Sequence, residues 1–294
     1  MNAEAYSALV HWIKERYSIK LKREAGQPPP WTQDPILQQY RFCNVHRSDD
    51  KVSRWIAVNW RDPNRNDPHV WFAMLVARFI NLPETLSTIG YPVPFNARSM
   101  RKKLKERKAA GLKIWNPAYM VVGGMNKNGK GEKIDPMIDS VFGPLWAKRG
   151  ELTWRSGESL QSWYNALRQF NGMGSFMAGQ VVADFKFCVT APDAFTFAVS
   201  GPGSRRGMNR LLGRELKAPW KEEEWLNHLC TLNARLEPEI SSSGIPKIDF
   251  QSLQSCLCEL YKFLRVKNGE GHPKSFYVYP DGSTIKTINQ PKLL

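Results

Sequence analysis

Residues 167–184 read LRQFNGMGSFMAGQVVAD, and this stretch decides the predicted fold. One helix is expected to end near Asn171, and a second is expected to begin at Ser175. Between them the chain turns through Gly172 and Gly174, because glycine adopts positive φ angles and lets the backbone approach a ligand closely. The N–H groups that open the second helix then point outward, as they do in anion-binding sites. The stretch predicts two helices joined by a tight glycine turn.

Apolar residues at helical spacing extend this prediction along most of the chain. The Pro and Gly clusters between them mark where helices stop. Helices are predicted over residues 3–24, 34–60 (as one or two helices), 69–81, 96–110, 135–148, 157–169, 207–216, 221–236 and 249–266.

Two segments break the helical pattern. Residues 111–134 are the least helical, with a short strand expected in WNPAYMVVGG and a basic, glycine-rich loop after it. Alternating apolar residues around Asp281 and Gly282 predict a C-terminal β-hairpin. The expected fold is therefore mainly α, in one domain over residues 1–294. It carries a small β or irregular insertion at about 111–134, and its two-helix glycine turn occupies about 157–187.

The charge balance indicates a polyanionic partner. The chain has 42 Lys and Arg against 27 Asp and Glu, a net charge of +15. Nucleic acid is the first candidate, an anionic membrane surface the second, and a generally basic surface the alternative to both. The helix at 96–110 concentrates this charge, and Arg101, Lys102 and Lys105 are predicted to contact DNA. A solvated outer helix face explains the same run equally well.

Several function classes are disfavoured. Five cysteines form no C-x-x-C pair and five histidines no metal-binding spacing, so neither a metal nor another cofactor is expected. The glycines of residues 111–131 do not match the phosphate-binding loop of nucleotide-dependent kinases. No apolar run approaches the roughly 20 residues of a membrane span, so no membrane partner is expected.

A second glycine-rich segment, SGPGSRRG at 200–207, contains a hydroxyl and two arginines before a helix expected near Met208. Ser204, Arg205 and Arg206 are predicted to form a phosphate cradle, because arginine and a helix N-terminus both bind phosphate. The alternatives are a DNA-backbone contact or a plain loop.

The glycine turn, with its apolar flanks, resembles the helix-hairpin-helix element of DNA-repair glycosylases. The resemblance implies that Gly172, Gly174 and Ser175 hold a duplex backbone without reading its sequence. A glycine turn between any two helices is the alternative. Those glycosylases carry a catalytic Asp after the hairpin, where this chain has Ser200 and Gly201. Base excision is therefore not expected.

Three segments together resemble one family: FCNVHRSDDKVS at 42–53, the GPGSRRG motif, and LCELYK at 257–262. The family is the α-glutamyl/putrescinyl-thymine pyrophosphorylase group of phage DNA-hypermodification proteins, related to the helical domain of 5-hydroxymethyluracil DNA kinases. His46 and Ser48 depart from its pattern, since apolar residues are more usual there. The resemblance implies that an amine replaces the phosphate on the 5-hydroxymethyl group of a thymine analogue inside DNA.

Such a reaction needs a flipped base, cations for the leaving phosphate and a base for the incoming ammonium. The candidates for catalysis are Asp184, Glu259 and Arg47. Contacts to the substrate or its base are expected from Asn44, Asp50, Asn209 and Lys262. The alternative for Asp50 and Asp184 is an ordinary ion pair, and for Glu259 and Lys262 a salt bridge within one helix.

The first hypothesis is a transferase that acts on double-stranded DNA carrying a modified uracil, in the cytoplasm of an infected bacterium. Its co-substrate is a free amino acid or another amine, with glycine the expected donor. A non-catalytic DNA-binding partner of a base kinase is the alternative, and a DNA glycosylase comes third.

Overall fold

The computed structural model describes residues 1–116 and 133–285. Over these residues the protein is mainly helical, which confirms the predicted fold class. The chain divides into two compact units, unit 1 with Met1–Asp50 and Ala198–Leu294, and unit 2 with Lys51–Phe197. One domain over 1–294 stays a prediction, and each unit is described by itself.

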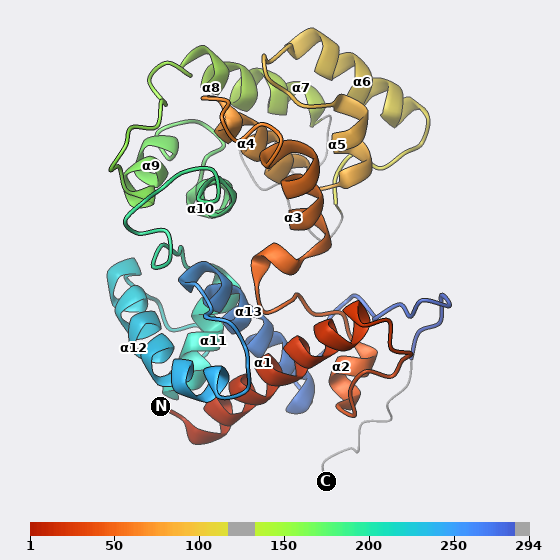
Figure 1. The fold of residues 1–294 in the computed structure, drawn as a ribbon, viewed down its shortest axis with the longest axis vertical. Helices are drawn as coiled ribbons and strands as arrows, with labels where there is room; N and C mark the ends of the chain where they lie inside the picture. Colours follow the sequence, from red (N-terminus) through yellow and green to blue (C-terminus); the bar gives the residue numbers. More distant parts are fainter. Residues whose placement is uncertain (117–132, 286–294) are drawn as a thin grey trace. The chain divides into compact units, whose positions relative to one another are not determined.

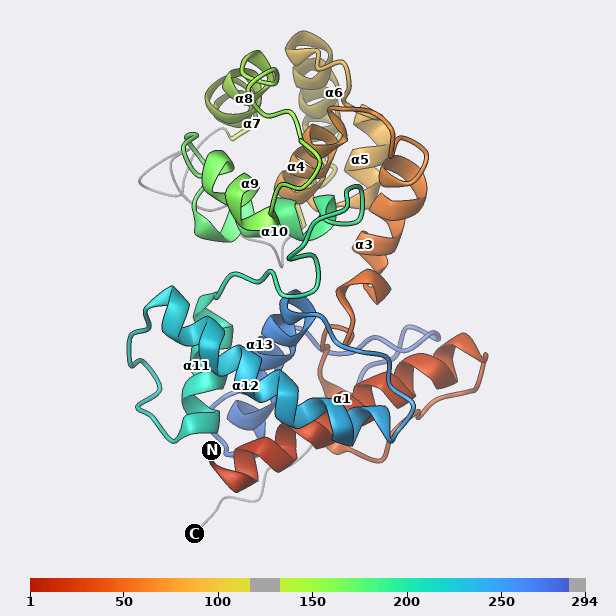
Figure 2. The same ribbon diagram turned by 60° about the vertical axis from the view of Figure 1, so that its left-hand side comes forward.

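Unit 1 is built around the last helix of the chain, which packs on the other long helices (Figures 1 and 2). Its core contains the fully buried side chains of Trp12 and Trp225. Asn2 and Asp249 cap the two helices that the sequence places best, since each side chain accepts backbone N–H groups of the first turn. The elements are α1 (Ala3–Glu24), α2 (Pro35–Gln39), η1 (Arg47–Asp49), α11 (Pro202–Leu212), α12 (Glu222–Ser241) and α13 (Phe250–Lys267).

Two glycines set the close packing of α11 against α13. A Cβ at Gly203 would lie 2.3 Å from Sγ of Cys258, and a Cβ at Gly207 would lie 2.1 Å from the carbonyl oxygen of Leu257. Both distances are far below contact distance, so only glycine fits. The glycines four residues apart therefore form a helix-packing face, with α11 already begun at Pro202. The helix predicted over 207–216 therefore begins earlier, at Pro202, and the glycine-rich turn expected up to Gly207 is wrong from Pro202 onward.

Unit 2 surrounds a buried helix, α4, with aromatic side chains. Every residue of α4 is buried, and rings of Phe79 and Phe142 lie 5.4 Å apart at its side. The rings of Trp163 and Phe185 stack at 4.5 Å. The elements are α3 (Lys51–Ile56), η2 (Ala57–Arg61), α4 (Val70–Ile80), α5 (Pro83–Ile89), α6 (Ala97–Ala109), α7 (Ile134–Met137), η3 (Ile138–Phe142), α8 (Gly143–Ala147), α9 (Leu160–Leu167) and α10 (Ser175–Phe185).

The two predicted β segments have different outcomes. The described part of the C-terminal segment contains a tight turn, in which the N–H of Tyr279 donates to the carbonyl of Ser283, and no strand. Phe276 instead forms an isolated bridge with Tyr40, which directly follows α2, and the rings of the two residues stack. The hairpin is therefore not found in residues 276–285. The strand expected near 115–124 lies almost entirely outside the described residues.

Candidate functional site

Glu259 is the centre of a buried polar cluster in unit 1. Its side chain is 8% exposed, and its Oε2 atom accepts a hydrogen bond from Nζ of Lys262 at 2.7 Å. The same oxygen accepts the backbone N–H of Cys43 at 3.0 Å. The salt bridge within α13 that the sequence offered as the simple alternative is therefore present. It is joined by a contact to a segment far away in the chain.

The segment at 43–50 supplies the rest of this group. Arg16 of α1 donates to the carbonyl of Cys43 at 3.1 Å and to Oδ1 of Asn44 at 2.8 Å. Asn44 donates its side-chain amide to the carbonyl of Asp49, and its backbone N–H to Asp50 at 3.0 Å. We call Arg16, Asn44, Asp50, Glu259 and Lys262, with the Cys43 backbone, the Glu259 cluster. Two of the three family-like segments, 42–53 and 257–262, meet in it.

Arg16 and Glu259 are the buried members of the cluster. The others are more accessible: Asn44, Asp50 and Lys262 are half-buried, and Cys43 is exposed. Burial lowers the pKa of Arg16 and outweighs the opposing attraction of Glu259. Burial also lowers the pKa of Lys262, but the charge of Glu259, the Cys43 thiol and the hydrogen bond to Glu259 together more than reverse this effect, so the net shift is upward. The pKa of the Cys43 thiol is raised well above its ordinary value, first by the charge of Glu259. Glu259 thus stabilises the charged form of Lys262.

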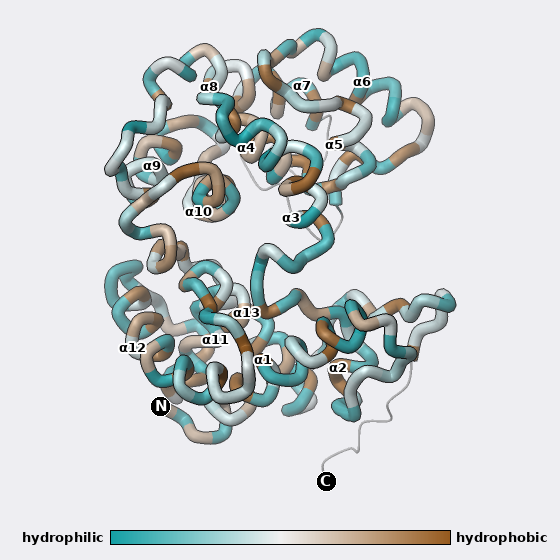
Figure 3. Tube along the Cα trace, in the orientation of Figure 1, coloured by the Kyte–Doolittle hydropathy of each residue, from teal (hydrophilic) through white to brown (hydrophobic). Residues whose placement is uncertain are grey.

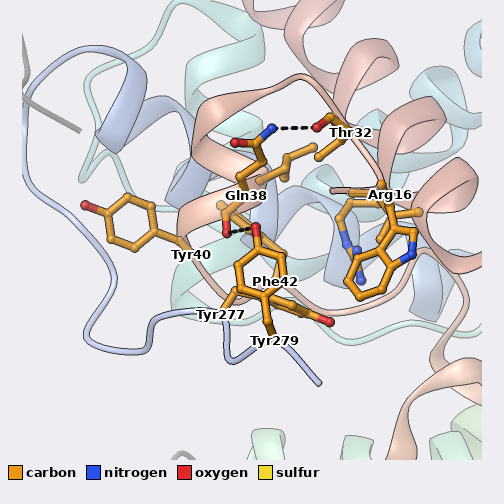
Figure 4. Close-up of a pocket in the computed structure, with 10 residues that line it drawn as sticks. Arg16, Thr32, Gln38, Tyr40, Phe42, Tyr277 and Tyr279 are labelled. Carbon is orange, nitrogen blue, oxygen red and sulfur yellow. Dashed lines mark hydrogen bonds between the residues drawn. The ribbon is translucent and has the colours of Figure 1, made fainter. Parts of the chain in front are cut away.

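Arg16 also lines a narrow cavity with a wall of aromatic rings (Figure 4). Tyr279 donates its hydroxyl to the carbonyl of Gln38, and the ring of Tyr279 stacks on Trp31 at 6.1 Å. The cavity measures about 20 Å³, which is room for about one water molecule. The cavity therefore has no space for a base or an amino acid.

Two larger grooves lie on the surface of unit 1. They measure about 520 and 410 Å³, and both are lined by His11 and Asp34. Nε2 of His11 lies 2.8 Å from a carboxylate oxygen of Asp34. Grooves of this size admit a small polar molecule, unlike the cavity at Arg16.

The predicted phosphate cradle is occupied by the protein's own groups. Ser204 is fully buried, and its hydroxyl binds both the N–H and the carbonyl of Gly201, which caps α11. Arg205 donates to the hydroxyl of Ser200 at 2.7 Å and to Glu222 at 3.1 Å. These contacts hold the start of α11 to the start of α12. They favour a structural role for Ser204 and Arg205, whose phosphate binding stays a prediction.

Arg206 has different surroundings. Its guanidinium lies 5.4 Å from the ring centroid of Tyr261, and the guanidinium of Arg265 lies 5.7 Å from the same centroid. Arg206 is therefore the member of the predicted cradle that shares an aromatic ring with a second arginine.

Arg47 is a further predicted cation. It donates its backbone N–H to the hydroxyl of Ser252.

Asn209 has a clear structural role. Its amide nitrogen donates to the carbonyls of Leu216 and Ala218, and its Oδ1 accepts the indole N–H of Trp220 at 2.7 Å. The side chain is buried. It fixes the connection between α11 and α12, and its predicted substrate contact stays a prediction that these bonds do not favour.

Asp184 lies in unit 2 and forms a buried ion pair. Arg78 of α4 binds both oxygens of its carboxylate, one of them at 2.8 Å. The same guanidinium donates to Ser53 at 2.9 Å and to Asn81 at 3.0 Å. A carboxylate held at both oxygens by arginine is a poor proton acceptor. The ion pair named as the alternative is present, and a catalytic role for Asp184 stays a prediction.

The glycine turn joins α9 to α10. Gly172 has a φ of +78°, and a Cβ there would meet a side-chain carbon of Val141 at 2.6 Å. Gly174 precedes α10, and Gly174 and Ser175 are both exposed. Gly172 is thus explained by packing, while Gly174 and Ser175 are accessible to a ligand. Their contact with DNA stays a prediction.

The basic helix α6 is hydrophilic along most of its length (Figure 3). Arg101 pairs with Asp135 at 2.8 Å and with Asp139, and Lys105 pairs with Asp135 at 2.8 Å. Lys102 is 76% exposed and lies 3.9 Å from Glu106. Acidic residues of α7 and η3 therefore neutralise part of the predicted DNA-binding face.

The sequence did not predict the buried positions of Arg16 and Arg78. Arg16 follows Trp12 and Ile13 on the buried side of α1, and Arg78 is the one cation in the otherwise apolar helix α4. A single cation on an apolar helix face is the signal that finds such residues, since it needs a buried partner.

Two further features, a metal site and a membrane-spanning helix, are absent from the described residues. Within residues 1–116 and 133–285, no group of three His, Cys, Asp or Glu side chains is placed to hold a metal ion. No helix in the described part of the chain is long and apolar enough to cross a membrane.

Comparison with known proteins places the whole helical region in one family. The model of the 5-hmdU DNA kinase helical domain matches residues 3–272. The chain is similar to the 5-hmdU DNA kinase of Bacillus phage SP10, with 26% identity over 221 residues. This match covers 67% of the chain and 34% of the phage protein, so the chain spans about a third of its relative. No solved structure matches.

Proposed function

We propose, since this chain belongs to the family of 5-hmdU DNA kinase helical domains, that it acts in DNA hypermodification during phage infection. The proposed substrate is a 5-phosphomethyl-type deoxyuridine in double-stranded DNA. The amine of an amino acid, with glycine as the expected donor, replaces the phosphate or pyrophosphate on the exocyclic carbon. The reaction is thus an amino acid:DNA transfer, placed in the cytoplasm of the infected host.

The Glu259 cluster is the observation that supports this proposal. It gathers Arg16, Asn44, Asp50, Glu259 and Lys262 from three segments of the chain, around the buried side chains of Arg16 and Glu259. Removing each charge from water costs several kcal/mol, so a fold gains little stability from such a group. Clusters of perturbed ionisable groups are frequent at functional sites.

The free oxygen of Glu259 gives the cluster a chemical role. Both contacts to Glu259 use Oε2, and among the described residues Oε1 accepts no hydrogen bond. We assign Oε1 to the ammonium of the incoming amine, from which it takes a proton. The amine nitrogen then bonds to the exocyclic carbon as the carbon–oxygen bond to the phosphate breaks. Lys262 keeps Oε2 in place.

A non-catalytic DNA-binding module is the second candidate. The ion pairs of Asp184 with Arg78 and of Arg205 with Glu222 favour it, because they remove two of the predicted reactive groups. Such a module partners a base kinase and uses the same basic surface to hold DNA. A DNA glycosylase is disfavoured, since residues 200 and 201 provide no carboxylate.

One assay separates the three functions. Duplex DNA containing 5-phosphomethyl-deoxyuridine is incubated with the protein and isotope-labelled glycine, and then digested to nucleosides. A labelled nucleoside with release of phosphate supports the transferase. Retained duplex binding without an adduct from glycine or any other amine supports the module. Release of a free base supports a glycosylase.

A further inference from the structure

Arg206 of α11, with Tyr261 and Arg265 of α13, forms a small basic surface in unit 1 that we call the Tyr261 surface. The two guanidiniums lie 5.4 and 5.7 Å from the same ring centroid. All three side chains are half-buried. Each guanidinium makes a cation–π contact with the same ring.

Acidic residues do not neutralise the Tyr261 surface. Neither Arg206 nor Arg265 forms an ion pair with any residue in the described part of the chain. Two carboxylates of the surrounding sequence serve other groups: Glu270 pairs with Arg210 and accepts from Asn268, and Glu259 pairs with Lys262. The surface therefore keeps a local excess of two positive charges.

Two other arginines that lie over aromatic rings in unit 1 have an acid close by, whereas Arg23, which lies over Trp31 and Tyr277, forms no ion pair within the described residues. Arg214 lies 3.8 Å from the ring centroid of Trp220 and pairs with Glu224. Arg235 lies 4.1 Å from that of Tyr6, whose hydroxyl donates to Glu239 at 2.7 Å. Among the described residues of unit 1, Tyr261 is thus the aromatic ring over which two arginines lie.

We propose that the Tyr261 surface binds the phosphodiester backbone of DNA, through one phosphate contact from Arg206 and one from Arg265. Arginine binds phosphate through two parallel N–H groups, and it is more weakly hydrated than lysine, which suits a half-buried surface. Two guanidiniums over one ring supply one phosphate contact each. This inference rests on the proposed action on DNA, and adds a backbone contact in unit 1.

The salt dependence of duplex binding tests it. The affinity for an unmodified fluorescent duplex is measured by anisotropy over a series of salt concentrations. The double variant Arg206→Ala, Arg265→Ala is expected to flatten the slope of log affinity against log salt by about 1.8, from two contacts at about 0.9 each. The control Arg214→Ala, Arg235→Ala removes the same charge and should leave the slope near that of the wild type. Arg206→Lys, Arg265→Lys keeps both charges and should restore most of the slope.

Each outcome has one meaning. An unchanged slope in the Ala double variant, with the wild type binding duplex, overturns the Tyr261 surface as a backbone contact and leaves the proposed function standing. Wild-type protein without duplex affinity overturns the proposed function itself. Calorimetry with inorganic pyrophosphate covers the other source of phosphate. If the wild type binds pyrophosphate, the Ala variant does not, and the DNA slope is unchanged, the surface holds a small leaving group instead.

Discussion

The backbone N–H of Cys43 donates a hydrogen bond to Oε2 of Glu259 over 3.0 Å, although the two residues are 216 positions apart in the chain. Lys262 donates to the same oxygen from one turn along α13. This arrangement fixes one oxygen of the carboxylate and leaves the other for a ligand. It is the structural basis of the role proposed for Glu259.

Replacing Glu259 by Gln should abolish most of the transfer while leaving the protein folded. An amide oxygen still accepts the Cys43 N–H, but a neutral amide takes no proton from the amine. A positioned general base contributes about 10²- to 10⁴-fold, so we expect a fall of at least about 100-fold in the rate of labelled-glycine transfer. Glu237→Gln, at a surface pair with Lys247, is the matched control and should retain the wild-type rate. Transfer at the wild-type rate in Glu259→Gln would remove Glu259 from the mechanism.

Asp184→Asn should act on stability. The change leaves Arg78 buried without its bidentate partner, and breaking a buried ion pair costs about 3–5 kcal/mol. We expect a loss of this size in the free energy of unfolding, measured by urea denaturation. Asp135→Asn disrupts exposed pairs with Arg101 and Lys105 and should lower the free energy of unfolding much less, because solvent screens these pairs. Equal, small losses in both variants, with transfer lost only in Asp184→Asn, would instead support the catalytic role.

Gly207→Ala should destabilise unit 1 strongly. The added Cβ would lie 2.1 Å from the backbone oxygen of Leu257, which cannot move without shifting α13. Overpacking of this kind costs about 1–3 kcal/mol or more. Gly174→Ala is the control, since nothing lies within 4 Å of its Cβ position and its φ is negative. If thermal unfolding shows equal stability for the two variants, α11 and α13 do not pack as described.

The Lys262–Glu259 pair should stabilise the protein only below strongly alkaline pH. The folded-state pKa of Lys262 is raised above its ordinary value of 10.5 by Glu259, against the effect of burial. A raised lysine pKa gives stability that is fully present below the unfolded pKa and is lost as the pH rises through the folded pKa. The difference in unfolding free energy between the wild type and Lys262→Met should therefore be constant to about pH 10 and shrink above it. A difference that grows with pH in this range would contradict the pairing.

Local signals in the sequence predicted much of the fold. The bounds of α1 and α13 follow from the capping residues Asn2 and Asp249, since a cap and a helical apolar pattern act within a few residues. The start of α11 was missed for the opposite reason. Gly203 and Gly207 suggest a loop, but their cause is contact with α13, which lies about fifty positions further along the chain.

The candidate site likewise combines local contacts, which the sequence predicts, with contacts between distant segments, which it does not. The pair of Glu259 with Lys262 is local to one helix, and residue spacing suggests it. The contacts of Glu259 with Cys43 and of Arg16 with Asn44 join distant segments, and no spacing rule predicts them. Likewise, the pair of Arg205 with Glu222 joins α11 to α12, and no local spacing predicts it.

The transfer assay on modified duplex DNA is the direct test of amine transfer by this protein. Wild-type protein, labelled glycine and 5-phosphomethyl-deoxyuridine DNA are combined, and the digested nucleosides are analysed by mass spectrometry. We expect a glycine-bearing thymidine analogue together with released phosphate, both lost in Glu259→Gln and retained in Glu237→Gln. Duplex that is bound but chemically unchanged, with glycine and with every other amine supplied, would contradict it.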